Sequence, residues 1–285
     1  GLSAKPGSLN PIGRFGTGLK YSIAVLVRMN IKVTLFIGQT EYVFYKVAES
    51  FRGQDYDAIR MKKRNSLLAK WTYHKLPFTT QYGRDWKLWQ VFREMHANTL
   101  DEQGETLNCS WQTEPIKGEE GRTLFVIEGN EYLDEYLHMN RTFLPDGATV
   151  RTSDEHIQVI DRPSKYIYYR GMRIMDLRKE AMFTYNFLET IDLTEDRTAK
   201  YPSLLEAQIV GCMQTSKDLA FVEKAVAKPV KDSFEAGISH TTGYGYGYSS
   251  VTPSRGYLAA AKESPNVTAK EVWNQSQPTV PDSMR

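Results

Sequence analysis

The sequence predicts an α+β protein, a two-layer sandwich in which helices cover a mixed or antiparallel sheet. Three observations support this prediction. Apolar side chains recur at helical spacing over 19–29, apolar and polar residues alternate over 31–37, and the long stretch 86–102 contains neither glycine nor proline. A strand placed between two helices of this kind indicates a sheet that is covered on one face.

The remaining elements follow in order along the chain. A second strand over 42–47 comes after Gly38-Gln39, so the two strands are expected to form a hairpin. Further elements are predicted from the same patterns: strands, both more loosely, at 57–61 and 67–73, and one at 123–128; a helix at 131–139; a strand at 158–160; a hairpin at 165–174 with glycine at its turn; a strand at 181–187; and a helix at 202–213.

Three segments are expected from the changes in composition. Residues 1–150 form the first domain and residues 151–230 a smaller α+β region. Residues 231–285 are rich in Gly, Tyr, Ser and Pro, including the repeat 243–248, and are expected to be a flexible tail. Its role is left open, because an alternating Gly-Tyr segment also suits binding.

Composition restricts the function classes only weakly. The chain of 285 residues is 41% hydrophobic and 25% charged, with a net charge of +2, so charge indicates neither nucleic acid nor membrane, although nucleic acid is not excluded. The longest apolar run, 23–27, is too short to span a bilayer, and a cytoplasmic protein is expected. Cys109 and Cys212 lie far apart and predict neither a zinc site nor a disulfide framework.

A glycine-rich turn, residues 12–20, precedes the first predicted helix. Gly13, Gly16 and Gly18 allow close backbone approach to a ligand, and the N–H groups of a first helical turn attract anions. Together with Lys20, they predict a phosphate cradle. Lys5 would reach the same phosphate from the preceding loop, and the alternatives are an ordinary turn and a solvated lysine.

Three polar residues share one face of the predicted helix 86–102. Glu94, Asn98 and Asp101 stand at positions i, i+4 and i+7. A carboxylate that orients water beside an amide oxygen that ligates a hard cation suits metal-assisted phosphate hydrolysis. The alternative is a solvated polar face opposite a buried stripe, which is expected to consist of Trp86, Trp89, Phe92 and Met95.

These two motifs resemble those of the GHKL ATPase superfamily, which has the Bergerat ATP-binding fold. The pattern Glu94-x-x-x-Asn98-x-x-Asp101 is similar to its N box, and residues 13–20 are similar to its second glycine box. The resemblance implies a Bergerat-like ATP-binding domain over 1–150 and a transducer-like region after it, with ATP and Mg²⁺ as ligands. It implies Glu94 as general base and Asn98 as the magnesium ligand. The residues that it implies at the nucleotide, besides Asn98 and Asp101, are Lys5, Gly13, Arg14, Phe15, Gly16, Thr17, Gly18, Leu19 and Lys20.

The order of the motifs differs from that of the family. The glycine box precedes the N box here, which a circularly permuted fold explains. The acid that would contact adenine is then either Glu128, at the end of a predicted strand, or a residue upstream of Gly1. Glu102 stands where the family has alanine.

The expected activity is Mg-ATP binding with slow hydrolysis, coupled to a conformational or protein-partner switch. The alternative is a nucleotide-binding interaction module, or a structural assembly module, without significant turnover.

Overall fold

The computed structural model describes residues 17–145, 147–153, 156–238, 240, 253–265 and 267. The chain is α+β, as predicted, and divides into two compact units, Gly1–Thr142 and Phe143–Arg285. The division falls eight residues before the expected boundary at 150. Among the described residues, no helix is long and apolar enough to cross a membrane.

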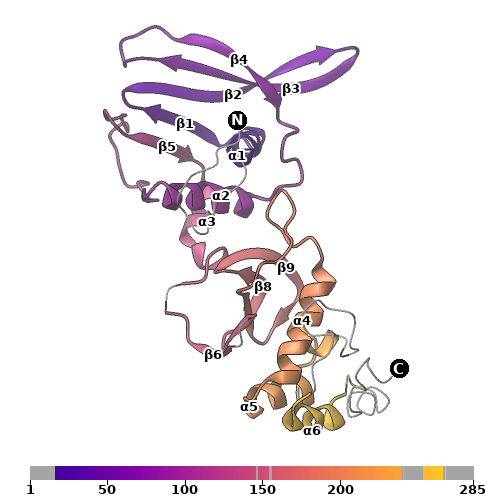
Figure 1. Ribbon diagram of the computed structural model, residues 1–285. Coiled ribbons are helices and arrows are strands. Elements are labelled where there is room, and N and C mark those ends of the chain that lie inside the picture. The colour runs from indigo at the N-terminus through magenta and orange to yellow at the C-terminus, as the bar shows by residue number, and fades with distance from the viewer. Residues whose placement is uncertain are drawn as a thin grey trace, which may run out of the picture. The chain divides into compact units, whose positions relative to one another are not determined.

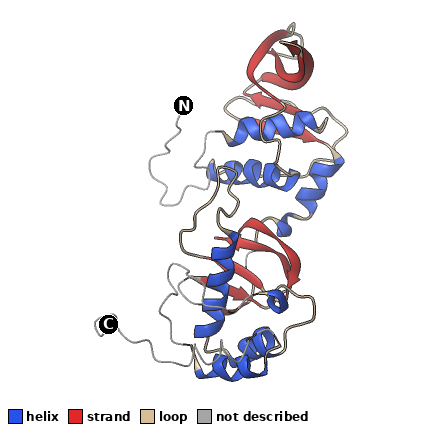
Figure 2. Cartoon of the chain, turned by 90° about the vertical axis from the view of Figure 1, so that its right-hand side faces the viewer, coloured by secondary structure: helices blue, strands red, loops and turns tan. Residues whose placement is uncertain are grey.

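The first unit is an antiparallel sheet with its helices gathered on one face (Figures 1 and 2). Its five strands lie in the order β4-β3-β2-β1-β5. The elements are α1 (Gly18–Arg28), β1 (Lys32–Ile37), β2 (Thr40–Phe51), β3 (Gln54–Arg64), β4 (Thr72–Thr79), α2 (Leu88–Asp101), β5 (Thr123–Glu128), α3 (Asn130–Leu137) and a 3-10 turn, η1 (Met139–Arg141). The predicted hairpin is β1–β2.

Helix α1 is the central element of the first unit. It contacts β1, β2 and β4 as well as α2, and every residue from Ser22 to Val27 is buried. A helix that is apolar nearly all round has to be covered on both sides. Ile23, Ala24 and Val27 pack with Ile59 and Phe78 of the sheet.

Helix α2 buries most of its predicted stripe. Trp89, Phe92 and Met95 are buried, and the Phe92 ring lies edge-on to Tyr132 of α3, with 5.8 Å between centroids. Trp86 precedes the helix and is only partly buried; its ring packs against Tyr21 of α1 at 5.4 Å. The aromatic side chains therefore fix α2 between α1 and α3.

The C-terminal end of α1 fixes the loop that leads into α2. The Arg28 guanidinium donates to the carbonyl oxygens of Thr80 at 2.6 Å and Gly83 at 3.0 Å. A cation at a helix C-terminus also interacts favourably with the helix dipole. Arg28 therefore positions α2 relative to α1 from the end of α1 opposite the glycine turn.

The strand predicted at 67–73 was wrong in position. Residues 65–71 form the turn between β3 and β4, and the strand runs over Thr72–Thr79. Pro77 obscured the strand in the sequence, since proline is disfavoured in sheets. It is tolerated because β4 is an edge strand, where one side of the backbone needs no partner.

The second unit is a mixed five-stranded sheet with helices packed on it. Its strands lie in the order β6-β7-β10-β8-β9, and the β10–β8 pair is parallel. The elements are β6 (Val150–Ser153), β7 (Ile157–Ile160), β8 (Ser164–Tyr169), β9 (Met172–Ala181), β10 (Thr184–Phe187), α4 (Pro202–Thr215), α5 (Leu219–Val222), a π-helical turn η2 (Glu223–Ala227), a 3-10 turn η3 (Glu235–Gly237) and α6 (Arg255–Glu263).

The described part of 231–285 differs from the expected flexible tail. Phe234, Ile238, Tyr257, Ala261 and Val267 belong to the core of the second unit. These apolar residues are sparse in the sequence, so the polar composition around them concealed their burial. The Gly-Tyr repeat at 243–248 lies outside the described residues.

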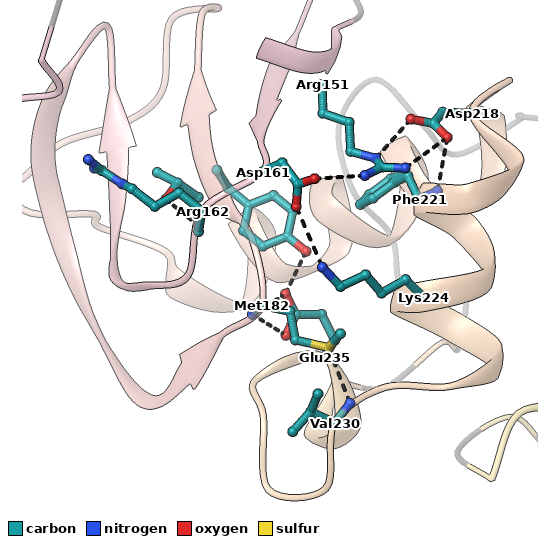
Figure 3. Close-up of polar contacts among 11 residues, drawn as sticks. Arg151, Asp161, Arg162, Met182, Asp218, Phe221, Lys224, Val230 and Glu235 are labelled. Atoms are coloured by element: carbon teal, nitrogen blue, oxygen red, sulfur yellow. Dashed lines mark hydrogen bonds and ion pairs between the residues drawn. The ribbon is translucent and has the colours of Figure 1, made fainter. Parts of the chain in front are cut away.

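The second unit also buries a carboxylate, that of Glu235. The backbone N–H of Met182 donates to both carboxylate oxygens, at 3.0 and 2.9 Å, and the Tyr185 hydroxyl donates to Oε1 at 2.9 Å (Figure 3). Burial raises the pKa of Glu235, although these hydrogen bonds oppose the shift.

Candidate functional site

Gly18 and Glu94, one from each sequence motif, are in contact. Gly18 is the first residue of α1, and Glu94 lies on the buried side of α2 with a residue exposure of 3%. A Cβ atom added to Gly18 would lie 2.9 Å from Glu94 Cγ and closer still to the carboxylate. A larger residue at position 18 would therefore displace the Glu94 carboxylate from the start of α1.

Asn98 lies one helical turn after Glu94 and contacts it. The Asn98 amide nitrogen donates to Glu94 Oε1 at 3.0 Å. The i, i+4 spacing in α2 produces this contact, since the two residues lie on one face of the helix, as predicted from the sequence. Because the nitrogen faces Glu94, the amide oxygen is the Asn98 atom suited to a hard cation such as Mg²⁺. Magnesium commonly takes only one or two protein ligands and completes its shell with water and phosphate oxygens.

The N-terminal end of α1 has the charge distribution that suits an anion. Thr17 is its N-cap residue, and the first turn, Gly18-Leu19-Lys20, contains a basic but no acidic residue. Leu19 and Lys20 are exposed. The first backbone N–H groups of a helix and its positive dipole end both favour negative charge. The Glu94 carboxylate already lies at this end of the helix.

The other predicted residues divide into two groups. Asp101 is the last residue of α2 and is partly buried. Lys5, Gly13, Arg14, Phe15 and Gly16 lie outside the described residues.

Glu128 is placed at the end of β5, on the edge strand next to β1. Its carboxylate forms an ion pair with Lys32 of β1 at 2.7 Å, and both side chains are about half exposed. This pairing provides a structural role for Glu128 as a cross-strand partner.

Two buried polar residues near the predicted site were missed. Ser22 is fully buried one turn after Gly18, and its hydroxyl has no hydrogen-bond partner among the described residues. Arg93, next to Glu94, is 1% exposed, and its guanidinium lies over the Trp89 ring at 5.0 Å. In the sequence, each of these is a polar residue inside an apolar pattern. That pattern alone does not distinguish a functional site from a packed core.

His96 belongs to the packing of α2. Its ring stacks on Phe92 with 5.6 Å between centroids, and Nδ1 lies 2.9 Å from the Thr106 hydroxyl. Burial lowers the pKa of His96, so the neutral imidazole is favoured at pH 7.

A shallow depression of about 640 Å³ lies elsewhere in the first unit, at the turn between β1 and β2. Gly38, Asn65 and Glu120 are among the residues that line it. It contains none of the predicted site residues, and its open shape does not suggest a nucleotide pocket. Compared with protein-family models, curated proteins and solved structures, the chain matches none. The residues around Gly18 and Glu94 are therefore the candidate site of the first unit.

Proposed function

We propose that the first unit binds Mg-ATP at the N-terminal end of α1 and hydrolyses it slowly, as a switch for a conformational change or a protein partner. The observation that carries this proposal is the contact of Gly18 with Glu94. Two motifs that are distant in sequence, each suited to a different part of phosphate chemistry, meet at one helix end. Their resemblance to the GHKL boxes supports the same assignment.

Each residue has a distinct role in this proposal. The first-turn N–H groups of α1 and Lys20 bind phosphate, together with Gly13, Arg14, Phe15 and Gly16 of the preceding turn. Asn98 would hold Mg²⁺, which when bound neutralises phosphate charge. Glu94 orients the attacking water and accepts its proton. Asp101 supports the polar face of α2.

Ligand-dependent thermal unfolding tests the binding step. A ligand that binds the folded state stabilises it by mass action, by about 2.7 kcal/mol at a hundredfold excess over Kd. We expect ATP with magnesium to raise the Tm of the wild-type chain more than ATP alone or GTP. Asn98→Ala should lose the part of this rise in Tm that depends on magnesium. Unchanged unfolding curves at millimolar Mg-ATP would contradict the proposal.

Phosphate release tests the chemical step. Removing a general base usually lowers a rate by about 10²- to 10⁴-fold. We expect Glu94→Gln, which keeps the shape of the side chain, to retain ATP binding and lose turnover. Glu94→Ala should behave in the same way. Turnover at the wild-type rate in both variants would remove Glu94 from the mechanism.

A second candidate is a nucleotide-binding or assembly module without turnover. The burial of Glu94 and its hydrogen bond from Asn98 favour this alternative, because a carboxylate at a helix N-terminus stabilises the helix without any ligand. ATP binding with background phosphate release would indicate the binding module. The absence of both would indicate that Gly18 and Glu94 serve helix packing alone.

A further inference from the structure

The β3–β4 hairpin concentrates positive charge that the whole-chain average conceals. Residues 60–75 contain six Lys or Arg and no Asp or Glu, whereas the entire chain has a net charge of only +2. Polyanionic surfaces attract clusters of this kind within about a Debye length, roughly 8–10 Å at physiological salt. The hairpin is therefore the part of the chain best suited to an anionic surface.

Two leucines project from the turn of this hairpin. Leu67 is 54% exposed and Leu68 is 100% exposed. The backbone N–H of Ala69 donates to the carbonyl oxygen of Ser66 at 3.1 Å, so the leucines occupy the two central positions of a closed turn. A pair of fully or largely exposed leucines at a turn requires an explanation beyond the scattered apolar exposure that is normal for protein surfaces.

The turn is held in place by Arg64. Its Nη1 donates to the Leu67 carbonyl oxygen at 3.0 Å, and Nε donates to Glu41 at 2.7 Å. The Arg64 guanidinium also lies 4.5 Å from the centroid of the Trp71 ring, and the Lys62 ammonium lies 4.6 Å from it. The turn that carries the two leucines is therefore held by hydrogen bonds, and the Trp71 ring with its two cations lies at its base.

We propose that this turn docks the protein peripherally on an anionic phospholipid surface. Leu67 and Leu68 enter the boundary between head groups and acyl chains, and Lys63 and Lys70 contact the lipid head groups. Bilayer affinity of this type depends on buried apolar area together with attraction to anionic lipids. Trp71 is amphipathic, as are the tryptophans that concentrate at membrane interfaces. This proposal is independent of ATP binding at α1.

A single-stranded nucleic acid fits the same surface less well. Nucleic-acid grooves combine unpaired cations with open aromatic rings. Here Arg60 and Arg64 are ion-paired with Glu49 and Glu41, and cations already lie over the Trp71 ring. The exposed leucines would also remain in water.

Sedimentation of the full chain with lipid vesicles tests the proposal. We expect binding to vesicles of phosphatidylcholine with phosphatidylserine, weak binding to phosphatidylcholine alone, and weaker binding at high salt. Leu67→Ser with Leu68→Ser should lower the partition coefficient by about tenfold or more. Lys63→Gln and Lys70→Gln should each lower it about fivefold.

Matched substitutions elsewhere provide the controls. Leu137 in α3 is 60% exposed, and Lys165 in β8 is exposed, so Leu137→Ser and Lys165→Gln should leave vesicle binding unchanged. Circular dichroism checks that each variant is folded. Absence of binding to anionic vesicles would overturn the proposal, and so would full binding by the leucine variant. Binding to a single-stranded oligonucleotide in place of vesicles would assign the hairpin to nucleic acid.

Discussion

Among the described residues, each unit buries one glutamate, and the two carboxylates have different surroundings. Glu235 in the second unit receives hydrogen bonds from the Met182 N–H, between β9 and β10, and from the Tyr185 hydroxyl of β10. The Glu94 carboxylate in the first unit lies against the start of α1 and accepts a hydrogen bond from the Asn98 amide nitrogen. The amide oxygen of Asn98 is a second polar atom that could bind a ligand. The first carboxylate is part of a core, whereas the second is the general base of the proposed function.

The largest expected difference is in stability. Glu235→Ala leaves the Met182 N–H and the Tyr185 hydroxyl without their buried acceptor, at a cost of about 3 kcal/mol. Glu94→Ala should cost less, about 1–2 kcal/mol, because Asn98, which donates to Glu94, is only partly buried and can bind water instead. Hydrogen exchange of the β10 amides measures the effect of Glu235→Ala on the second unit. Tryptophan fluorescence during urea unfolding measures the effect of Glu94→Ala on the first unit. Equal losses would remove the distinction between the two carboxylates.

The next effect concerns the contact of Gly18 with Glu94. Helix propensity alone predicts that Gly18→Ala stabilises α1 by about 1 kcal/mol. Overlap of the new methyl group with Glu94 predicts the opposite sign, a loss of about 1–3 kcal/mol. Urea unfolding of the first unit measures the sign directly.

A double-mutant cycle separates these two contributions. In a Glu94→Ala background the overlap is absent, so Gly18→Ala should become stabilising. Destabilisation of the same size in both backgrounds would show that Gly18 is required for a reason other than its approach to Glu94.

The free energy of unfolding of the second unit should depend on pH through the Glu235 carboxyl. Burial raises the folded-state pKa of Glu235 above its ordinary value of 4.5, so the fold favours the protonated carboxyl. The stabilising contribution is complete below pH 4.5 and is lost as pH rises through the folded pKa, by about 1.4 kcal/mol for each unit of pKa difference. Glu235→Gln, which does not titrate, should lack this component. Identical pH profiles for both proteins would contradict the assignment.

The sequence predicted the elements better than their contacts. The uninterrupted apolar spacing of α1 and α2 identified both helices, and the spacing of Glu94 and Asn98 placed them on one helix face, where they form a hydrogen bond. Local patterns do not report approach between distant segments, so the fit of Glu94 against Gly18 was not predicted. Tertiary context also decided the position of β4, whose Pro77 is acceptable only at an edge.

The smallest effect concerns Ser22, whose hydroxyl is buried one turn after Gly18 without a hydrogen-bond partner among the described residues. A buried unpaired hydroxyl is unfavourable, and alanine has the higher helix propensity. Ser22→Ala should therefore raise the unfolding free energy of the first unit by about 0.5–1 kcal/mol, in contrast to the loss expected at Glu235. Urea unfolding followed by tryptophan fluorescence measures this change. A loss of stability would mean that the Ser22 hydroxyl contributes to holding α1 against α2, and the polar contacts at this end of α1 would then resemble the satisfied network around Glu235.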